Sequence, residues 1–260
     1  MEKFISPDGT HIAYLKQGEG PPLVLVHGTG VVAKSWMLVL PDLAKNFTVY
    51  AIDRRGRGQS GDTEPYSIER EYEDIAAVVD AIDQPVNLMG HSFGGLCAFE
   101  GALRTMNVHK LLLYEPPLRL NGGQPMLEEL VEEVETLLKD GENEDALVTL
   151  YSRRGTPIVD IERMQASPEW EERVAIADTI PREIREIDRY TFEPKKFSVL
   201  QSPTRFLVGE EHLPFFNDLI QVLIETLPDC SSDMIPGQKH FAMDTAPDLF
   251  VDALTRFFID

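Results

Sequence analysis

The chain of 260 residues is long enough for one large α/β domain, or for one domain that carries an insertion. Its 44 acidic and 24 basic side chains give a formal net charge of −20, which disfavours binding to nucleic acid, to anionic membrane surfaces and to polyphosphates. The chain has only two cysteines, too few for a disulfide framework. The signal-peptide type of apolar stretch is missing from its first residues, MEKFISPDGTHIAY, and no apolar run is long enough to span a membrane. We therefore expect a cytoplasmic protein.

Short apolar runs of strand type alternate with amphipathic segments of helix length. The expected strands are THIAYL, PPLVLV, FTVYAI, PVNLM, KLLLY and TRFLV, with KQGEG as a hairpin connection between the first two. Helices are expected at 32–45, 67–82, 96–106, 215–227 and 246–258. This alternation predicts an α/β fold with a mostly parallel sheet covered by helices, whose ligand site lies beyond the carboxyl ends of the strands.

The alternation stops between 119 and 200, where the sequence shows helix signals and no convincing strand. QPMLEELVEEVETLLKDG places leucine and valine on one helical face, and other segments begin with Ser or Thr followed by Pro. We therefore divide the chain into a core, 1–118 and 201–260, and a helical insertion, 119–200, over the carboxyl edge of the sheet. The functional interpretation of the insertion is a lid over a binding site, and the alternative is a subdomain without a role in binding.

The segment VHGTGVVAKSW follows an expected strand and admits two interpretations. One is a phosphate-binding loop that Gly28 opens and Lys34 and Ser35 close, although Ala33 stands where such a loop has its second glycine. The other is a loop whose backbone N–H groups face a developing oxyanion. The first interpretation predicts an ATPase and the second an acyl-transfer enzyme, and the negative charge of the chain argues against the ATPase.

The strongest motif is Gly90-His91-Ser92-Phe93-Gly94, a G-x-S-x-G sequence directly after one expected strand and before a helix. A nucleophile on a sharp strand-to-helix turn needs strained backbone angles, and its neighbours must lack side chains for the turn to close. The hydroxyl then stands at the positive end of the helix, where negative charge is favoured. Ser92 is therefore the expected nucleophile.

Four motifs, HGTG, DRRGRGQS, GHSFGG and GQKHF, occur in this order over almost the whole chain. In these motifs the sequence resembles the α/β-hydrolase superfamily, and within it a lid-bearing esterase or haloperoxidase-like serine hydrolase. The resemblance implies an eight-stranded sheet with the nucleophile after the fifth strand and the insertion between strands six and seven. It also implies that the N–H groups of Thr29 and Phe93 form the oxyanion hole. DRRGRGQS is then the turn after the fourth strand, where we expect Asp53 and one arginine to brace the loop.

A serine hydroxyl needs a base to act as a nucleophile at neutral pH. The superfamily that the sequence resembles carries its catalytic histidine in a late G-x-x-H loop, which Gly237 and His240 match. Of the other histidines, His27 and His91 are built into turns, where we expect them to bond backbone groups. His240 is therefore the expected base.

The triad acid departs from the pattern of the superfamily. Its usual place is the third residue after the glycine that ends the seventh strand, and here that residue is His212. We place Glu115 first, because it follows the sixth strand, where some members of the superfamily carry the acid. Glu211 or Glu210, after the seventh strand, is the second alternative, and a Ser–His dyad without an acid is the third.

Together these residues predict a serine hydrolase that cleaves small to medium, mostly apolar carboxylic esters through an acyl-enzyme, with no metal, cofactor, nucleic-acid or membrane partner. The candidates for an apolar substrate pocket are Trp36, Met126, Leu130, Trp170 and Phe241. The same residues would also suit a carbon–carbon bond hydrolase, a perhydrolase or an acyltransferase. An alternative of another class is a ligand-binding sensor on a hydrolase scaffold that turns over slowly or not at all.

Overall fold

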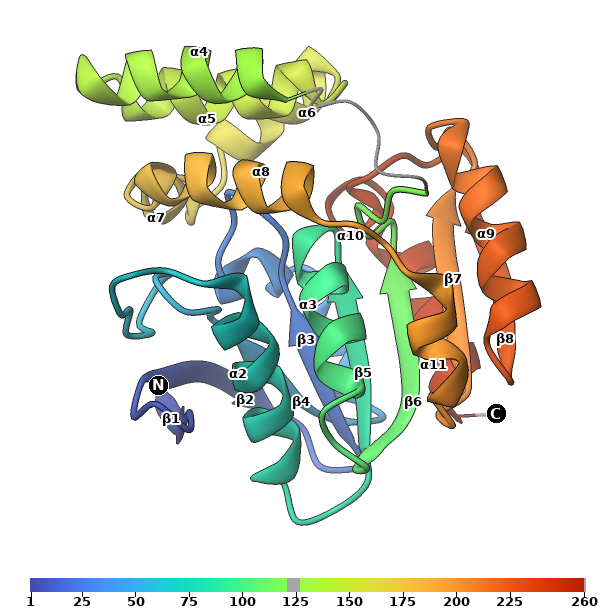
Figure 1. Cartoon of the computed structure of the whole chain (residues 1–260). Helices are drawn as coiled ribbons and strands as arrows, with labels where there is room; N and C mark the ends of the chain where they lie inside the picture. The colour runs from blue at the N-terminus through green and yellow to red at the C-terminus, as the bar shows by residue number, and fades with distance from the viewer. Residues whose placement is uncertain (121–126, 260) are drawn as a thin grey trace.

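The computed structural model describes residues 1–120 and 127–259. Within these residues, eight strands form one sheet in the order β1-β2-β4-β3-β5-β6-β7-β8 (Figure 1). The strands are β1 (Glu2–Ile5), β2 (His11–Gln17), β3 (Pro22–Val26), β4 (Thr48–Ile52), β5 (Val86–His91), β6 (Val108–Tyr114), β7 (Thr204–Gly209) and β8 (Cys230–Ile235). β2 pairs antiparallel with β1 and β4, and all other pairs are parallel. The predicted fold class, a mostly parallel eight-stranded α/β sheet, is confirmed.

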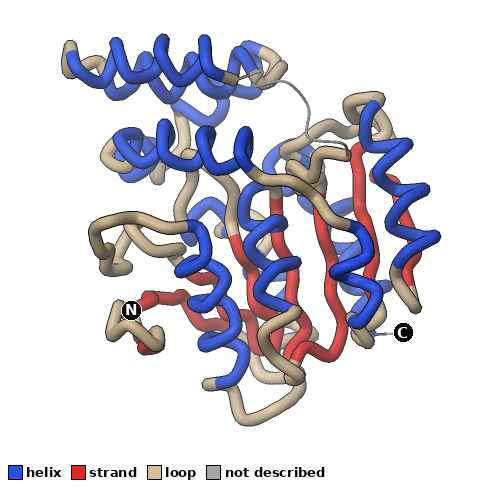
Figure 2. The backbone as a smooth tube through the Cα atoms, viewed as in Figure 1, coloured by secondary structure: helices blue, strands red, loops and turns tan. Residues whose placement is uncertain are grey.

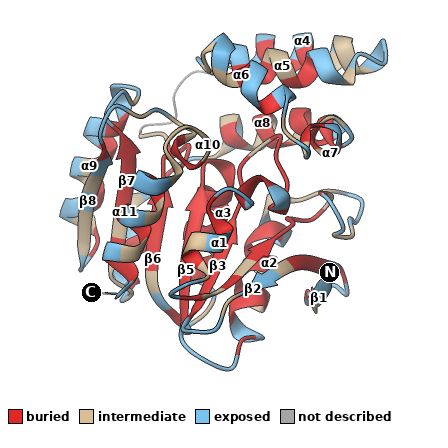
Figure 3. Cartoon of the chain, turned by 180° about the vertical axis from the view of Figure 1, so that it is seen from behind, coloured by how far each residue is buried: buried red, intermediate tan, exposed pale blue. Residues whose placement is uncertain are grey.

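Helices cover both faces of the sheet (Figure 2), and the residues of the central strands β3 and β5 are buried throughout. One face carries α2 (Ile68–Asp80), α3 (Phe93–Ala102) and α9 (Phe215–Thr226). The opposite face, seen in Figure 3, carries η1 (Ala33–Trp36), α1 (Leu40–Leu43), α10 (Ala242–Thr245) and α11 (Pro247–Ile259). Burial on both faces explains why these strands appear in the sequence as continuous apolar runs.

Between β6 and β7 the described residues form helices and loops. These are α4 (Glu128–Lys139), α5 (Asn143–Arg153), α6 (Ile158–Gln165), α7 (Trp170–Val174), η2 (Ala177–Thr179), α8 (Ile180–Arg189) and η3 (Pro194–Val199). We call α4 to α8 the inserted helices; they lie above the carboxyl ends of the strands in Figure 1. Their buried apolar side chains, such as Leu147 and Ile184, make a hydrophobic cluster of their own. The inserted helices therefore have an apolar core separate from the two cores that flank the sheet.

The hairpin predicted between β2 and β3 is wrong, because β4 lies between these two strands and pairs with both. The connecting segment instead packs against the chain that enters β4. A Cβ atom on Gly18 would lie 2.2 Å from the carbonyl oxygen of Phe47, so this loop requires glycine for a close approach. Two apolar runs joined by a glycine-rich link are compatible with either arrangement, and only the pairing of β4 decides between them.

The single helix predicted for 32–45 is also wrong, since the structure has two short pieces there, η1 and α1. Pro41 lacks an N–H group and restricts the residue before it, so a continuous α-helix does not pass through this position. Lys34, which belonged to the phosphate-loop interpretation, lies in η1 and pairs with Glu172 of α7. The other helices of the core lie close to their predicted ranges.

No helix in the described ranges combines the length and apolar character that a membrane crossing requires.

Candidate active site

Ser92 lies at the sharp turn between β5 and α3. Its φ is 53° and its ψ is −126°, a conformation that a residue with a side chain rarely adopts. Its N–H donates to the carbonyl of Tyr114 at the end of β6, at 2.9 Å. A Cβ atom on Gly94 would lie 2.2 Å from the carbonyl oxygen of His27, so the turn closes only with glycine there. The strained strand-to-helix turn expected from the G-x-S-x-G motif is therefore present.

His240 and Glu115 meet at the carboxyl edge of the sheet, from the loops after β8 and β6. Nδ1 of His240 donates to Oε2 of Glu115 at 2.6 Å, and the glutamate is only 4% exposed. The φ of Glu115 is 45°, in the left-handed region, where strain of about 1 kcal/mol or more is typical and often marks a functional site. Because the carboxylate accepts a hydrogen bond from Nδ1–H, the ring proton sits on Nδ1, and Nε2 has a lone pair that can take a proton.

The end of β7 holds Glu115 from its other side. Gly209, the last residue of β7, donates its N–H to Oε1 of Glu115 at 2.9 Å. A Cβ atom on Gly209 would lie 2.3 Å from the carbonyl oxygen of Gln238, so the histidine loop packs directly on this glycine. The Tyr114 hydroxyl donates to the carbonyl of Lys239, immediately before His240. Both oxygens of the glutamate and the backbone of the histidine loop are thus held in place.

The residues that follow Gly209 make other contacts. Glu210 accepts a hydrogen bond from the N–H of Gly237 at 2.7 Å. Glu211 is exposed and pairs with Lys239 at 3.5 Å. His212, in the usual position of the acid, has its Nδ1 2.7 Å from the carbonyl oxygen of Gly209. Of the carboxylates proposed for the triad, the structure brings Glu115 to the His240 ring.

The other two histidines near the site bond backbone groups, as predicted. Nε2 of His91 donates to the carbonyl of His240 at 2.9 Å, and burial, followed by the charge of His240, lowers the pKa of His91 well below its usual value. His27 accepts the N–H of Arg54 at 3.1 Å. Burial, helped by the Arg54 charge, lowers the pKa of His27 well below its usual value. Both rings are therefore neutral supports of the surrounding loops.

Thr29 and Phe93, the residues expected to form the oxyanion hole, lie in segments that meet at Ser92. Within the part of the chain that the structure describes, neither backbone N–H donates to another protein group. Phe93 directly follows the serine, and Thr29 follows Gly28, where a Cβ atom would lie 2.9 Å from Cβ of Ser92. Two unengaged N–H groups next to a hydroxyl are the arrangement that stabilises an oxyanion.

Asp53 and Arg54 brace the loop after β3, as the sequence led us to expect. Oδ1 of Asp53 accepts the N–H of Ala33 at 2.8 Å. The Arg54 side chain donates from Nε to the carbonyl of His27 at 2.8 Å and from Nη2 to the carbonyl of Gly28 at 3.0 Å. The turn after β4 thereby fixes the backbone that precedes Thr29.

The five residues predicted to line a pocket lie in different places. Trp36 is 2% exposed and packs in the hydrophobic core beside the sheet. Leu130 and Trp170 are buried in the cluster of the inserted helices. Phe241, next to the histidine, packs against both the sheet core and the inserted helices. Met126 lies outside the described residues.

Sequence reasoning missed Tyr151 and Arg173, two buried residues of the inserted helices. The Tyr151 hydroxyl donates to the carbonyl of Gly30 at 2.8 Å. Burial raises the pKa of Tyr151, and the neighbouring Arg173 guanidinium opposes this rise. Arg173 is 1% exposed, and its Nη2 lies 3.3 Å from Glu169. Burial acts to lower its pKa, but Tyr151 and Asp244 outweigh burial and raise it, while Nε and Nη1 make no close hydrogen bond among the described residues. Both lie in ordinary amphipathic helices, so no local signal distinguishes them.

Among the described residues, no group of three or more His, Cys, Asp or Glu side chains is arranged to hold a metal ion.

Residues 23–253 match the model of the alpha/beta hydrolase family. A solved alpha/beta hydrolase from Sphaerobacter thermophilus DSM 20745 is 31% identical, with a TM-score of 0.83 over 99% of this chain and 100% of that chain. An esterase from Rhodococcus sp. ECU1013 shares the fold at 22% identity, with a TM-score of 0.74 over 98% of this chain and 97% of its own. A 2-hydroxy-6-oxo-6-(2'-aminophenyl)hexa-2,4-dienoic acid hydrolase of Metapseudomonas resinovorans is 25% identical over 99% of this chain and 90% of that protein. The chain therefore belongs to the α/β-hydrolase family and is an enzyme of that family.

Proposed function

We propose that the chain is a serine hydrolase that cleaves small to medium, mostly apolar carboxylic esters through an acyl-enzyme. The observation that carries this proposal is the 2.6 Å hydrogen bond between Nδ1 of His240 and the buried Glu115, at the same sheet edge as the strained turn of Ser92. A histidine held in this way is the base that a serine nucleophile requires.

The reaction proceeds in two halves. Ser92 Oγ attacks the ester carbonyl, His240 accepts its proton, and the N–H groups of Thr29 and Phe93 hold the oxyanion. The C–O bond to the alcohol then breaks, and His240 gives the proton to the departing oxygen. A water molecule, deprotonated by His240, cleaves the acyl-enzyme and releases the acid. Glu115 stabilises the imidazolium in both halves without taking its proton.

A fluorophosphonate probe, together with p-nitrophenyl acetate, butyrate and octanoate, tests the proposal. We expect covalent labelling at Ser92 and turnover of the esters, with the chain-length profile reporting the size of the acyl site. A folded protein that neither reacts with the probe nor turns over any ester would contradict the proposal and favour the ligand-binding sensor.

A second candidate is carbon–carbon bond hydrolysis of a keto acid, and the observation that favours it is Arg173. This buried guanidinium lies beside Tyr151, which bonds the loop of Thr29, and near Asp244, and its Nε and Nη1 make no close hydrogen bond within the described chain. A guanidinium whose donors are not all taken up by the protein matches a carboxylate, which accepts two parallel N–H bonds. The similar hydrolase from Metapseudomonas resinovorans is named for a substrate that is a keto acid and has no ester group in its name.

In carbon–carbon bond hydrolysis, Ser92 attacks the ketone and gives its proton to His240, the carbon–carbon bond breaks, and His240 passes that proton to the departing carbon. Water then cleaves the acyl-enzyme, as in ester hydrolysis.

Arg173→Met tests whether the substrate carries a carboxylate. Using p-nitrophenyl hemisuccinate and p-nitrophenyl butyrate, which have acyl chains of equal length, we expect KM for the hemisuccinate to rise about 100-fold and KM for the butyrate to stay within about threefold. A charge-assisted hydrogen bond contributes roughly 1.5–3 kcal/mol, and two of them would be lost. Arg163→Met is the matched control, because it removes the same charge from an exposed position in α6.

Two results would count against the carboxylate site. One is a parent enzyme that shows no preference for the hemisuccinate over the butyrate. The other is an Arg173→Met variant in which both substrates change by the same factor, because that would indicate a general disturbance of the inserted helices. Loss of dienoate absorbance with a 6-oxo-dienoic acid as substrate separates carbon–carbon cleavage from ester cleavage directly.

A further inference from the structure

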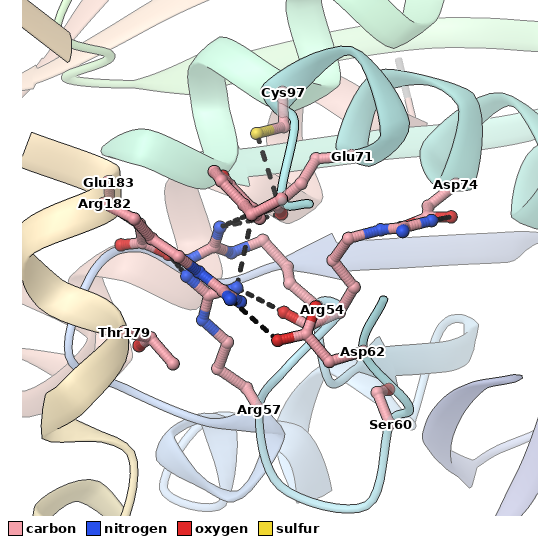
Figure 4. Close-up of polar contacts among 12 residues, drawn as sticks. Arg54, Arg57, Ser60, Asp62, Glu71, Asp74, Cys97, Thr179, Arg182 and Glu183 are labelled. Atoms are coloured by element: carbon pink, nitrogen blue, oxygen red, sulfur yellow. Dashed lines mark hydrogen bonds and ion pairs between the residues drawn. The ribbon is translucent and has the colours of Figure 1, made fainter. Parts of the chain in front are cut away.

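Behind the loop after β3, four charged side chains form a buried group that we call the Arg54 cluster: Arg54, Arg57, Glu71 and Glu183 (Figure 4). Each of the four side chains is at most 1% exposed. The two arginines come from the turn after β4 and Glu71 from α2, whereas Glu183 comes from α8, one of the inserted helices. The cluster therefore joins the core to the inserted helices through ion pairs that are shielded from solvent.

Each carboxylate of the Arg54 cluster is shared by both arginines. Nη1 of Arg54 donates to the two oxygens of Glu71 at 3.0 and 2.8 Å, and Nη1 of Arg57 lies 3.3 Å from Glu71. Nη2 of Arg54 and Nη2 of Arg57 both donate to Oε1 of Glu183. Burial acts to raise the pKa of Glu71, but the two arginines outweigh it and lower the pKa. Burial, followed by Arg54, lowers the pKa of Arg57 to about 10, so this group is still charged at neutral pH.

The Nε and Nη2 atoms of the Arg54 guanidinium contact the backbone of the candidate oxyanion hole, and Nη2 is also the atom that donates to Glu183. The guanidinium donates to the carbonyls of His27 and Gly28, at 2.8 and 3.0 Å, and its central carbon lies 4.7 Å from the ring centroid of Phe93. The Gly28 carbonyl and the Thr29 N–H belong to one planar trans peptide, so they point in opposite directions. A group that fixes the direction of this carbonyl therefore also fixes the direction of the Thr29 N–H.

We propose that Arg54 is the positioning residue of the oxyanion hole, and that Glu183 makes its orientation depend on the docking of α8. The inference rests on the proposed function, because the donors in question are the N–H groups of Thr29 and Phe93. Loss of Glu183 would leave two guanidiniums sharing one carboxylate. Their repulsion would then turn Arg54 away from the Gly28 carbonyl and leave the Thr29 N–H misaligned. The oxyanion hole is thus complete only when the inserted helices contribute their carboxylate.

Glu183→Gln tests this role, with Glu186→Gln as the matched control. Glu186 lies on the same helix and pairs with Arg189 outside the cluster. We expect Glu183→Gln to lower kcat for p-nitrophenyl butyrate by about 10-fold to 100-fold with KM within about threefold, since small misplacements of catalytic groups have effects of this size. Glu186→Gln should match the parent within about twofold.

The measurement must separate positioning from simple stabilisation. Rates are therefore divided by the concentration of active sites, which is measured by letting the fluorophosphonate label the protein to completion. If the cluster only stabilises the fold, Glu183→Gln lowers the melting temperature and the number of active sites but leaves kcat per site unchanged, and this result would overturn the inference.

Arg54→Lys gives a second test, because lysine keeps the charge but lacks the planar fork that reaches the two carbonyls. It should lower kcat per site in the same way. If Glu183→Gln does not fold, Glu183→Asp replaces it with the same expected direction.

Amide hydrogen exchange tests the same coupling without any substrate, so its result does not depend on the proposed function. If the parent turns over no ester, the proposed function fails, but the exchange rates of segments 23–36 and 92–97 still report on Arg54. Faster exchange there in Glu183→Gln than in Glu186→Gln would support the coupling. Equal exchange in the two variants would contradict it, whatever the reaction.

Discussion

Glu115→Gln is expected to lower kcat for p-nitrophenyl butyrate by about 10⁴-fold, with little change in KM, because removing the charge behind a catalytic histidine has this magnitude. Glutamine keeps the size of the side chain and an oxygen for the N–H of Gly209, which Glu115 accepts at 2.9 Å. It loses the negative charge that stabilises the imidazolium of His240, and its NH₂ group favours the wrong tautomer of the ring. Steady-state kinetics and the melting temperature of the variant are the measurements.

The matched control is Glu211→Gln, which changes the same functional group in the loop after β7. Because Glu211 is exposed and pairs with Lys239 at 3.5 Å, we expect activity within about twofold of the parent. The opposite result, a collapse in Glu211→Gln with Glu115→Gln active, would return the acid to its usual loop. Activity close to the parent in both variants would mean that Ser92 and His240 act as a dyad.

Ser92→Ala is expected to lower kcat by about 10⁶-fold and to abolish fluorophosphonate labelling, because the variant has no nucleophile for an acyl-enzyme. The fold should be retained, since alanine keeps the Cβ atom and the backbone N–H that donates to the carbonyl of Tyr114. Labelling monitored by mass spectrometry, together with ester turnover, gives the result. Ser198→Ala, at an exposed serine in η3, should behave like the parent. Turnover by Ser92→Ala at the parent rate would place the chemistry elsewhere.

The nucleophile turn was predictable because its determinants are local. Glycines at 90, 94 and 95 leave room for a tight turn, and the apolar run before them and the helix after them are visible in the sequence. The sharp turn at Ser92, with its φ of 53°, follows directly from this short pattern. The brace at Asp53 and Arg54 was predictable for the same reason, since it lies in the turn that leaves β4.

The strand order was predictable only in part. Periodicity placed most of the strands, but the neighbours of each strand depend on pairings between distant segments. The register of β4 with both β2 and β3 is such a pairing, and it overturned the predicted hairpin. Local patterns carry no information about which strand lies between two others, because that choice depends on how the whole sheet is covered.

The identity of the carboxylate at His240 was decided by tertiary structure. The sequence left Glu115, Glu210 and Glu211 as alternatives, since the ends of β6 and β7 are adjacent in the sheet. The residues that meet, Glu115 and His240, are 125 positions apart, and Gly209 of a third segment holds the other oxygen of the glutamate. No spacing rule predicts a contact that three loops make together.

By itself, the sequence determined the α/β fold class, the nucleophile turn at Ser92 and the late histidine loop, because local backbone conformation depends on neighbouring residues. Only the tertiary structure decided which side chains contact the residues of this turn and of the loops around it. It brought Glu115 to His240, Tyr151 to Gly30, and Glu183 to Arg54 across 129 positions. These contacts depend on the packing of the inserted helices and the strand ends, and burial of charged groups makes each of them costly to leave unpaired.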